Sequence, residues 1–170
     1  MGALQRLDLD AYKTVPKRPF TLVLDNLRSG LNVGSIFRSA DAFLVEKIWL
    51  CGITVQPPHR EILKTALGST ESVEWAYVTQ TADAIQVLRA EGYKIWALEQ
   101  TSPKTWLHDF APQPGEKHAF VIGNEVDGVD EQLLPLCDGA IEIPQYGTKH
   151  SLNVAVATGI LLWQVLNGKC

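Results

Sequence analysis

Three short polar stretches hold the residues whose types and spacing could do chemistry. The stretches are NVGSIFRSADAF, GNEVDG and SLNVAV, and their candidate residues are Asn32, Arg38, Glu125, Ser151 and Asn153. Amide, guanidinium, carboxylate and hydroxyl groups bind polar ligands through directed hydrogen bonds. Each stretch lies shortly after an apolar run, so the sequence predicts a ligand site assembled from three separate loops.

Each stretch also has an ordinary structural interpretation. Asn32 could cap a helix over 33–43, and Arg38 could pair with Asp41 on the wet face of that helix. GNEVDG could be a tight turn with glycines at positive φ, and SLN could be a helix start. Taken singly, none of the three stretches establishes a function.

The elements that must position these loops are short strands alternating with helices. Apolar runs predict strands, mostly buried on both faces, over 21–26, 47–52, 73–78, 94–99, 118–123 and 139–144. A helix is predicted from Thr81, as its N-cap, to a stop at Gly92. Segments 56–60 and 103–115 are predicted loops. This alternation indicates an α/β fold with a mainly parallel sheet flanked by helices, in which ligands bind beyond the carboxyl ends of the strands.

Composition limits the class of protein. We expect a single domain over 1–170, with no membrane-spanning run and a cytoplasmic location. The net charge of −4 argues against a protein that holds nucleic acid by its bulk field, although local contacts remain open. Cys51, Cys137 and Cys170 lack disulfide or metal-ligand spacing, so reduced thiols and no metal site are predicted.

Several familiar chemistries lack their motifs. No GxGxxG follows the first predicted strand, so a dinucleotide site lacks its fingerprint. No GxxxxGK[ST] or GxSxG is present, which argues against phosphate-cradle NTPases and serine hydrolases. Three polar loops in a fixed order along the chain remain as the distinctive feature.

That order and those residues resemble the SPOUT superfamily, in its branch of SpoU or TrmH-like RNA ribose 2′-O-methyltransferases. NVGSIFRSADAF is similar to the first motif of the branch, VIGNEVDGVDEQLL to the second and IEIPQYGTKHSLNVAVATGILL to the third. The resemblance covers 21–164. Leu44 departs from it, because the family usually has glycine there, and Gln145 stands where many relatives have methionine.

The resemblance implies an α/β knot fold with a deep C-terminal trefoil knot, preceded here by a short N-terminal extension over 1–20. It also implies an S-adenosylmethionine pocket formed by groups around Leu98, Gly123, Ile143 and Leu152. Arg38 would activate the ribose hydroxyl or clamp the adjacent phosphate. The remaining candidates would orient Arg38 and the ribose; they are Asn32, Glu125, Ser151 and Asn153. A homodimer with the site near its interface is implied, with an apolar final helix over 154–166 partly covered by the second copy.

The resulting hypothesis is methyl transfer from S-adenosylmethionine to structured RNA. EIPQYG, LEQT and ILLWQ resemble the catalytic domain of enzymes that methylate the D-loop guanosine of transfer RNA, which favours that substrate. Ribosomal RNA and the wobble ribose of transfer RNA are the alternatives. A SPOUT-like RNA-binding module without catalysis and a nicotinamide-dependent enzyme are hypotheses from other classes.

Overall fold

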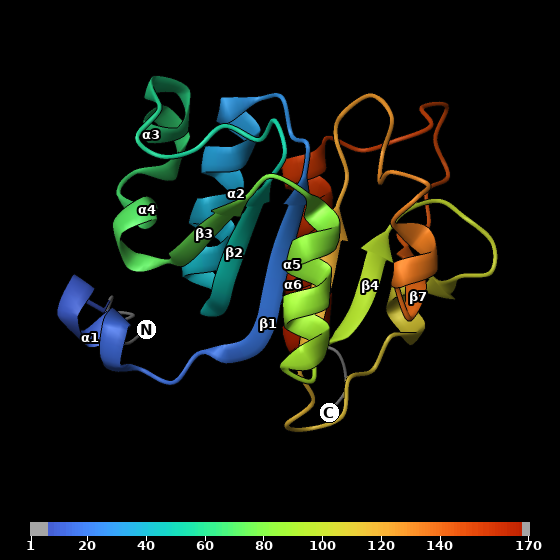
Figure 1. The fold of residues 1–170 in the computed structure, drawn as a ribbon, viewed down its shortest axis with the longest axis horizontal. Coiled ribbons are helices and arrows are strands. Elements are labelled where there is room, and N and C mark those ends of the chain that lie inside the picture. The colour runs from blue at the N-terminus through green and yellow to red at the C-terminus, as the bar shows by residue number, and fades with distance from the viewer. Residues whose placement is uncertain (1–6, 168–170) are drawn as a thin grey trace.

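The chain folds around one sheet in which all pairs of strands are parallel. The computed structural model describes residues 7–167, and its seven-stranded sheet has the order β3-β2-β1-β6-β4-β7-β5 (Figure 1). The strands are β1 (Arg18–Asp25), β2 (Val45–Cys51), β3 (Glu74–Val78), β4 (Lys94–Leu98), β5 (Thr105–Trp106), β6 (His118–Ile122) and β7 (Gly139–Glu142). The predicted α/β fold with a mainly parallel sheet is therefore confirmed.

Helices cover both faces of the sheet. They are α1 (Leu9–Thr14), α2 (Gly30–Ala42), α3 (Arg60–Ala66), α4 (Ser69–Ser72), α5 (Thr81–Ala90) and α6 (Val154–Asn167), with 3-10 turns η1 (Leu107–Asp109) and η2 (Leu134–Leu136). In Figure 1, α5 crosses in front of the sheet, whereas α2 and α6 lie behind it. No helix within residues 7–167 is long and apolar enough to cross a membrane.

The core divides into two layers because successive side chains of a strand point to opposite faces. On β1, Leu22 and Leu24 pack into the cluster that contains Phe37 of α2, while Val23 packs into the cluster that contains Leu88 of α5. These strand residues and Phe37 are fully buried. The continuous apolar sequence of β1 thus reflects burial on both sides of a central strand.

The predicted strands are found within a few residues of their expected ends, but two details of the sheet differ. β3 is not buried on both faces, because it forms an edge of the sheet and its residues are exposed or half-buried. β5 lies inside the predicted loop 103–115. A strand of two residues has no hydrophobic period that the sequence could reveal.

Two helix caps differ from the interpretation of the sequence, namely the alternative role of Asn32 as a cap and the predicted cap at Thr81. Ser29, not Asn32, caps α2, and its hydroxyl accepts a hydrogen bond from the backbone N–H of Asn32. Gln80 occupies the cap position of α5, and the hydroxyl of Thr81 donates instead to the buried carboxylate of Asp25 at 2.6 Å. At α2, an earlier residue, Ser29, is the cap. At α5, the Thr81 hydroxyl that local rules assign to the cap binds Asp25, which is distant in sequence.

The backbone conformation at Leu44 shows why glycine suits this position. It follows α2 and adopts a φ of 54°, in the left-handed region that favours glycine over residues with a side chain. The chain therefore keeps the sharp turn into β2 at the expense of backbone strain.

The strand order brings the three polar stretches together. β1, β6, β4 and β7 are neighbours in the centre of the sheet, and their carboxyl ends meet along one edge. The first stretch lies in α2, which follows the loop after β1, and the other two begin in the loops after β6 and β7, so the sheet places the three side by side. The C-terminal knot stays a prediction. Cys51 and Cys137 are free thiols, whereas Cys170 lies outside the described residues.

Candidate functional site

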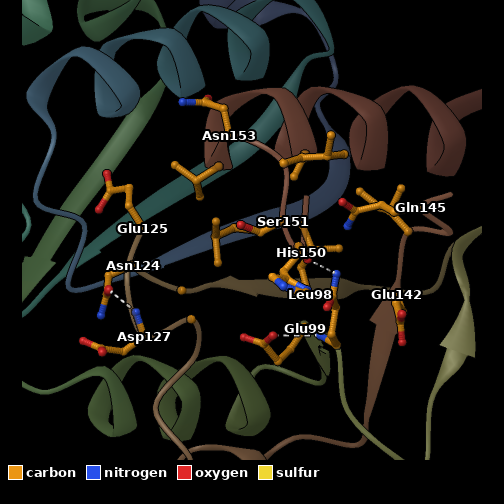
Figure 2. Close-up of a pocket in the computed structure, with 18 of the residues that line it drawn as sticks. Leu98, Glu99, Asn124, Glu125, Asp127, Glu142, Gln145, His150, Ser151 and Asn153 are labelled. Atoms are coloured by element: carbon orange, nitrogen blue, oxygen red, sulfur yellow. Dashed lines mark hydrogen bonds between the residues drawn. The ribbon is translucent and has the colours of Figure 1, made fainter. Parts of the chain in front are cut away.

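A cavity of about 520 Å³ opens at the carboxyl ends of β4, β6 and β7. The predicted cofactor residues all line it, namely Leu98, Gly123, Ile143 and Leu152. Of the other predicted site residues, Glu125, Ser151 and Asn153 also line it. Figure 2 shows Asn124, Glu125 and Asp127 on one side of the view and Glu142 and Gln145 on the other.

The second polar stretch is a turn whose shape is fixed by Asn124. The side-chain oxygen of Asn124 accepts hydrogen bonds from the backbone N–H groups of Val126 and Asp127, both at 2.8 Å. Backbone bonds at 3.1 Å join Asn124 and Gly128 in both directions. Gly128 has a φ of 73°, in the region that favours glycine, so the predicted tight turn is confirmed; Gly123 does not have the positive φ that was predicted for it. The turn holds Glu125 at its tip.

Glu125 joins the second stretch to the first. Its carboxylate accepts hydrogen bonds from the backbone N–H groups of Arg28 at 3.1 Å and Ser29 at 3.2 Å. It also accepts one from the side-chain amide of Asn32 at 2.9 Å. The carboxylate thus binds the start of α2, where unpaired N–H groups favour negative charge.

Asn153 joins the third stretch to the other two. Its side-chain nitrogen donates to the side-chain oxygen of Asn32 at 3.1 Å. Its side-chain oxygen accepts hydrogen bonds from the backbone N–H groups of Ala155 at 2.9 Å and Val156 at 3.3 Å. The predicted helix start at SLN is confirmed, and the same side chain also takes part in the site.

The electrostatic setting of Glu125 leads to a first prediction. Burial raises the pKa of this carboxyl, but the hydrogen bonds from Asn32, Arg28 and Ser29 outweigh it and hold the pKa below its ordinary value. The resulting stability is present above the unfolded pKa of about 4.3 and is lost as pH falls through the lower folded pKa. We expect Glu125→Gln to be less stable than the parent at neutral pH, with a difference that shrinks in acid.

Urea unfolding of both proteins across that pH range measures this difference. Glu131→Gln is the control, because Glu131 is an exposed carboxylate outside the network. A gap between the parent and Glu125→Gln that stays constant down to the acid limit would contradict the linkage.

Arg38 is the predicted residue that the structure does not bring into the cavity. It is exposed on α2 and does not line the cavity. Its alternative pairing with Asp41 was wrong, since no ion pair of Arg38 is found within the described chain. Asp41 accepts a hydrogen bond from the hydroxyl of Ser72 instead. Asn32 does not line the cavity either, but its hydrogen bonds tie it to two residues that do.

The walls of the cavity combine apolar and acidic groups. Leu98, Ile143 and Leu152 supply apolar surface, and such surface with a few convergent polar groups is typical of small-molecule sites. The acidic residues of the lining are Glu99, Glu125, Asp127 and Glu142. This charge favours a ligand that carries positive charge.

Several residues that line the cavity were not predicted from the sequence, and three of them bear on its structure. Asn124, Glu99 and Gln100 were not among the candidates, although all line the cavity. Glu99 accepts a hydrogen bond from the backbone N–H of Val129 at 2.9 Å and so ties the end of β4 to the turn after β6. The rule that ligand sites lie after strand ends could have found Glu99 and Gln100, because both directly follow β4.

Comparisons with known proteins agree with this geometry. The model of the SpoU rRNA Methylase family matches residues 19–163. The 23S rRNA (guanosine-2′-O-)-methyltransferase RlmB of Salmonella typhi is 33% identical over 162 residues, which are 95% of this chain and 65% of the relative. The chain thus spans about two thirds of the length of that curated relative.

Solved structures give the same result. The AdoMet-bound rRNA methyltransferase of Sinorhizobium meliloti superposes with a TM-score of 0.79 and 29% identity, covering 94% of this chain and 60% of that one. The SpoU methyltransferase AviRb of Streptomyces viridochromogenes, in complex with AdoMet, gives a TM-score of 0.75 and 26% identity, covering 92% and 60%.

Proposed function

The chain belongs to the SpoU rRNA methylase family, and from that premise we propose that it transfers a methyl group from S-adenosylmethionine to a ribose 2′-hydroxyl of RNA. One observation carries the proposal. Asn32, Glu125 and Asn153 come from three distant stretches of sequence and form one hydrogen-bonded network at the rim of the cavity. The names of the two AdoMet-bound relatives support the choice of methyl donor.

The cavity fits S-adenosylmethionine in size and chemistry. Its volume lies within the usual range for ligand pockets, about 300–1,000 Å³. Leu98, Ile143 and Leu152 can enclose the faces of an adenine, and Gly123 lets the backbone approach closely. The acidic lining complements the sulfonium and ammonium charges. When bound, this cofactor supplies an electrophilic methyl group.

The residues of the network would prepare the ribose. Glu125 is held by Asn32 and by the start of α2, so its position is fixed before RNA binds. Ser151 lies beside the network with its side chain exposed, where its hydroxyl can donate to or accept from the sugar. We assign Arg38 to the phosphate and the developing alkoxide, because a guanidinium stays protonated and is a poor base.

A homodimer would complete the site. On α6, Val156, Ile160 and Trp163 are 53%, 38% and 61% exposed, and their spacing places them on one face. On α2, which packs against α6, Leu31 is 44% exposed, and Arg38 lies seven residues later on the same side of the helix. A second copy that covers this apolar surface of α6 and α2 would lie next to Arg38. Arg38 could then act at the cavity of that copy.

This dimer predicts a change in mass that sedimentation can measure. The parent should sediment at about twice the chain mass of 18.8 kDa. Val156→Asp places a charge in the proposed interface and should give a monomer, while cofactor binding persists. Val87→Asp is the matched control, since Val87 is 41% exposed on α5, on the opposite face of the sheet. An active parent monomer at micromolar concentration would exclude the shared site.

Two RNA substrates are candidates. The motif resemblance favours the D-loop guanosine of transfer RNA, and this stays a prediction. Ribosomal RNA is the second candidate, because the Salmonella relative is named as a 23S rRNA guanosine methyltransferase. Mass mapping of ribose methylation in RNA from cells with and without the gene separates the two, since each predicts loss of one modification in a different RNA.

The cofactor proposal has a direct test. S-adenosylmethionine and its demethylated product should bind the isolated protein in calorimetry and raise its melting temperature, because only the folded state has the cavity. NAD is the control ligand and should do neither. Absence of binding at millimolar S-adenosylmethionine, or comparable binding of NAD, would refute the assignment. Binding without methyl transfer to any RNA would favour the non-catalytic module.

A further inference from the structure

A second hollow of about 500 Å³ adjoins the cofactor cavity, and we call it the side hollow. It shares Glu142, Gln145 and His150 with the cavity, and its own lining includes Trp106 and Tyr146. Gln100, which lines both, donates a hydrogen bond to the backbone oxygen of His150 at 2.6 Å. A ligand in the side hollow would therefore lie next to a ligand in the cavity.

Exposed aromatic rings dominate the side hollow. Tyr146 is 95% exposed and Trp106 is 37% exposed, although large aromatic side chains usually bury more of their surface. The ring of His108 is parallel to that of Trp106 within 8°, with 6.4 Å between the ring centroids. The buried side chains of Leu107 and Phe110 anchor the segment that carries Trp106 and His108, so these two rings are held in place.

The lining of the side hollow carries one ammonium group, that of Lys149, and one carboxylate, that of Glu142. Lys149 lines the hollow and is exposed. The ammonium of Lys104 lies 4.3 Å from the centroid of the Trp106 ring and pairs with Glu142. A hollow at the ends of β1 to β3 is lined instead by Asp25 and Asp130. Because Lys104 pairs with Glu142, the ammonium group of Lys149 is left to attract an anionic ligand with a flat ring.

We propose that the side hollow binds an unpaired base of the substrate RNA by stacking on Trp106 and Tyr146, while Lys149 contacts the adjoining phosphate. This inference rests on the proposed function and adds where single-stranded RNA is held. Proteins bind single strands by combining aromatic faces, on which bases stack, with positive charges that follow the backbone. The shared wall places that nucleotide next to the methyl donor.

The test measures two separate binding events. A short single-stranded oligoadenylate is the probe, and the variants are Trp106→Ala and Trp106→Phe. Removing the ring should weaken binding of the probe by roughly 10-fold or more, because stacking on one base contributes on that scale. Phenylalanine keeps a flat face and should recover much of it. Tyr77→Ala is the control, since Tyr77 is 38% exposed on β3, at the opposite edge of the sheet from β5.

Turnover on the methylated RNA gives an independent readout. Trp106→Ala should raise the KM for RNA and leave kcat and the affinity for S-adenosylmethionine unchanged, because Trp106 does not line the cofactor cavity. Lys149→Ala should weaken binding of the probe. It should also reduce the slope of log affinity against log salt concentration by about one, because one phosphate contact is lost.

The outcomes separate this inference from the proposed function. Normal methyl transfer with unchanged KM and probe affinity in Trp106→Ala would overturn the base site and leave the function standing. Loss of the dimer in Trp106→Ala would also overturn it, because the ring would then belong to an interface between copies. Ring-dependent binding of the probe in a protein that fails to bind S-adenosylmethionine would support the base site and refute the function.

Discussion

Replacing Arg38 with alanine is expected to lower the rate of methyl transfer by roughly 100-fold or more, the scale of one lost preorganised donor. The fold and the affinity for S-adenosylmethionine should not change, because Arg38 is exposed and lies outside the cavity. An ordinary exposed helix residue would instead change stability by less than about 0.5 kcal/mol and leave turnover intact. Single-turnover assays on the identified RNA distinguish these two results.

Two further variants show what Arg38 supplies. Arg38→Lys keeps the charge but loses the planar fork, so it should remain poor if two parallel hydrogen bonds are needed and recover if charge alone suffices. Arg60→Ala removes the same charge from an exposed position at the start of α3 and is the control. Equal losses of methyl-transfer rate in Arg38→Ala and Arg60→Ala would show that the effect comes from the overall positive charge that attracts RNA.

The second large effect is expected at Gly123. A Cβ atom there would lie 2.0 Å from the backbone carbon of Gly128 and 2.1 Å from the backbone nitrogen of Val129. Backbone atoms cannot rotate away as a flexible side chain can, so Gly123→Ala must displace the turn that holds Glu125. We expect a loss of about 2–3 kcal/mol of stability, which lowers the melting temperature by roughly 5–10 °C.

The same displacement should abolish tight cofactor binding, since the turn lines the cavity. Calorimetry with S-adenosylmethionine at a temperature where the variant stays folded tests this independently of stability. Gly147→Ala is the matched control, because a Cβ atom at Gly147 meets nothing within 4 Å. A Gly123→Ala protein with parental melting temperature and cofactor affinity would show that the turn tolerates the shift.

The sequence predicted the strands and turns around the site better than the hydrogen bonds between its side chains. The continuous apolar pattern of β1 and the turn residues around Gly128 report local geometry, so both were predicted correctly. Residue types alone did not show that Asn32 bonds to Glu125 and Asn153 rather than capping α2. Those partners are 93 and 121 residues away along the chain, and only the strand order brings them together.

The position of Arg38 shows a second limit. Its membership of the first motif came from a family resemblance, which carries no information about the side of α2 on which it lies. The helical period places Arg38 on the side of Leu31, and the structure shows that this side is not the cavity. Asn124 was also missed as a site residue. Its side chain accepts hydrogen bonds from the backbone of its own turn, which is the role of an ordinary turn residue.

The orientation of the Asn153 amide fixes the direction of the hydrogen bonds in the network. Its oxygen is committed to backbone N–H groups at the start of α6, so its nitrogen must face Asn32. Asn32 must then turn its oxygen to Asn153 and its nitrogen to Glu125. Neither amide can flip without breaking bonds at both ends. The backbone N–H groups at the start of α6 therefore fix the orientation of both amides. As a result, Asn32 always turns its N–H group, and never its oxygen, to the Glu125 carboxylate.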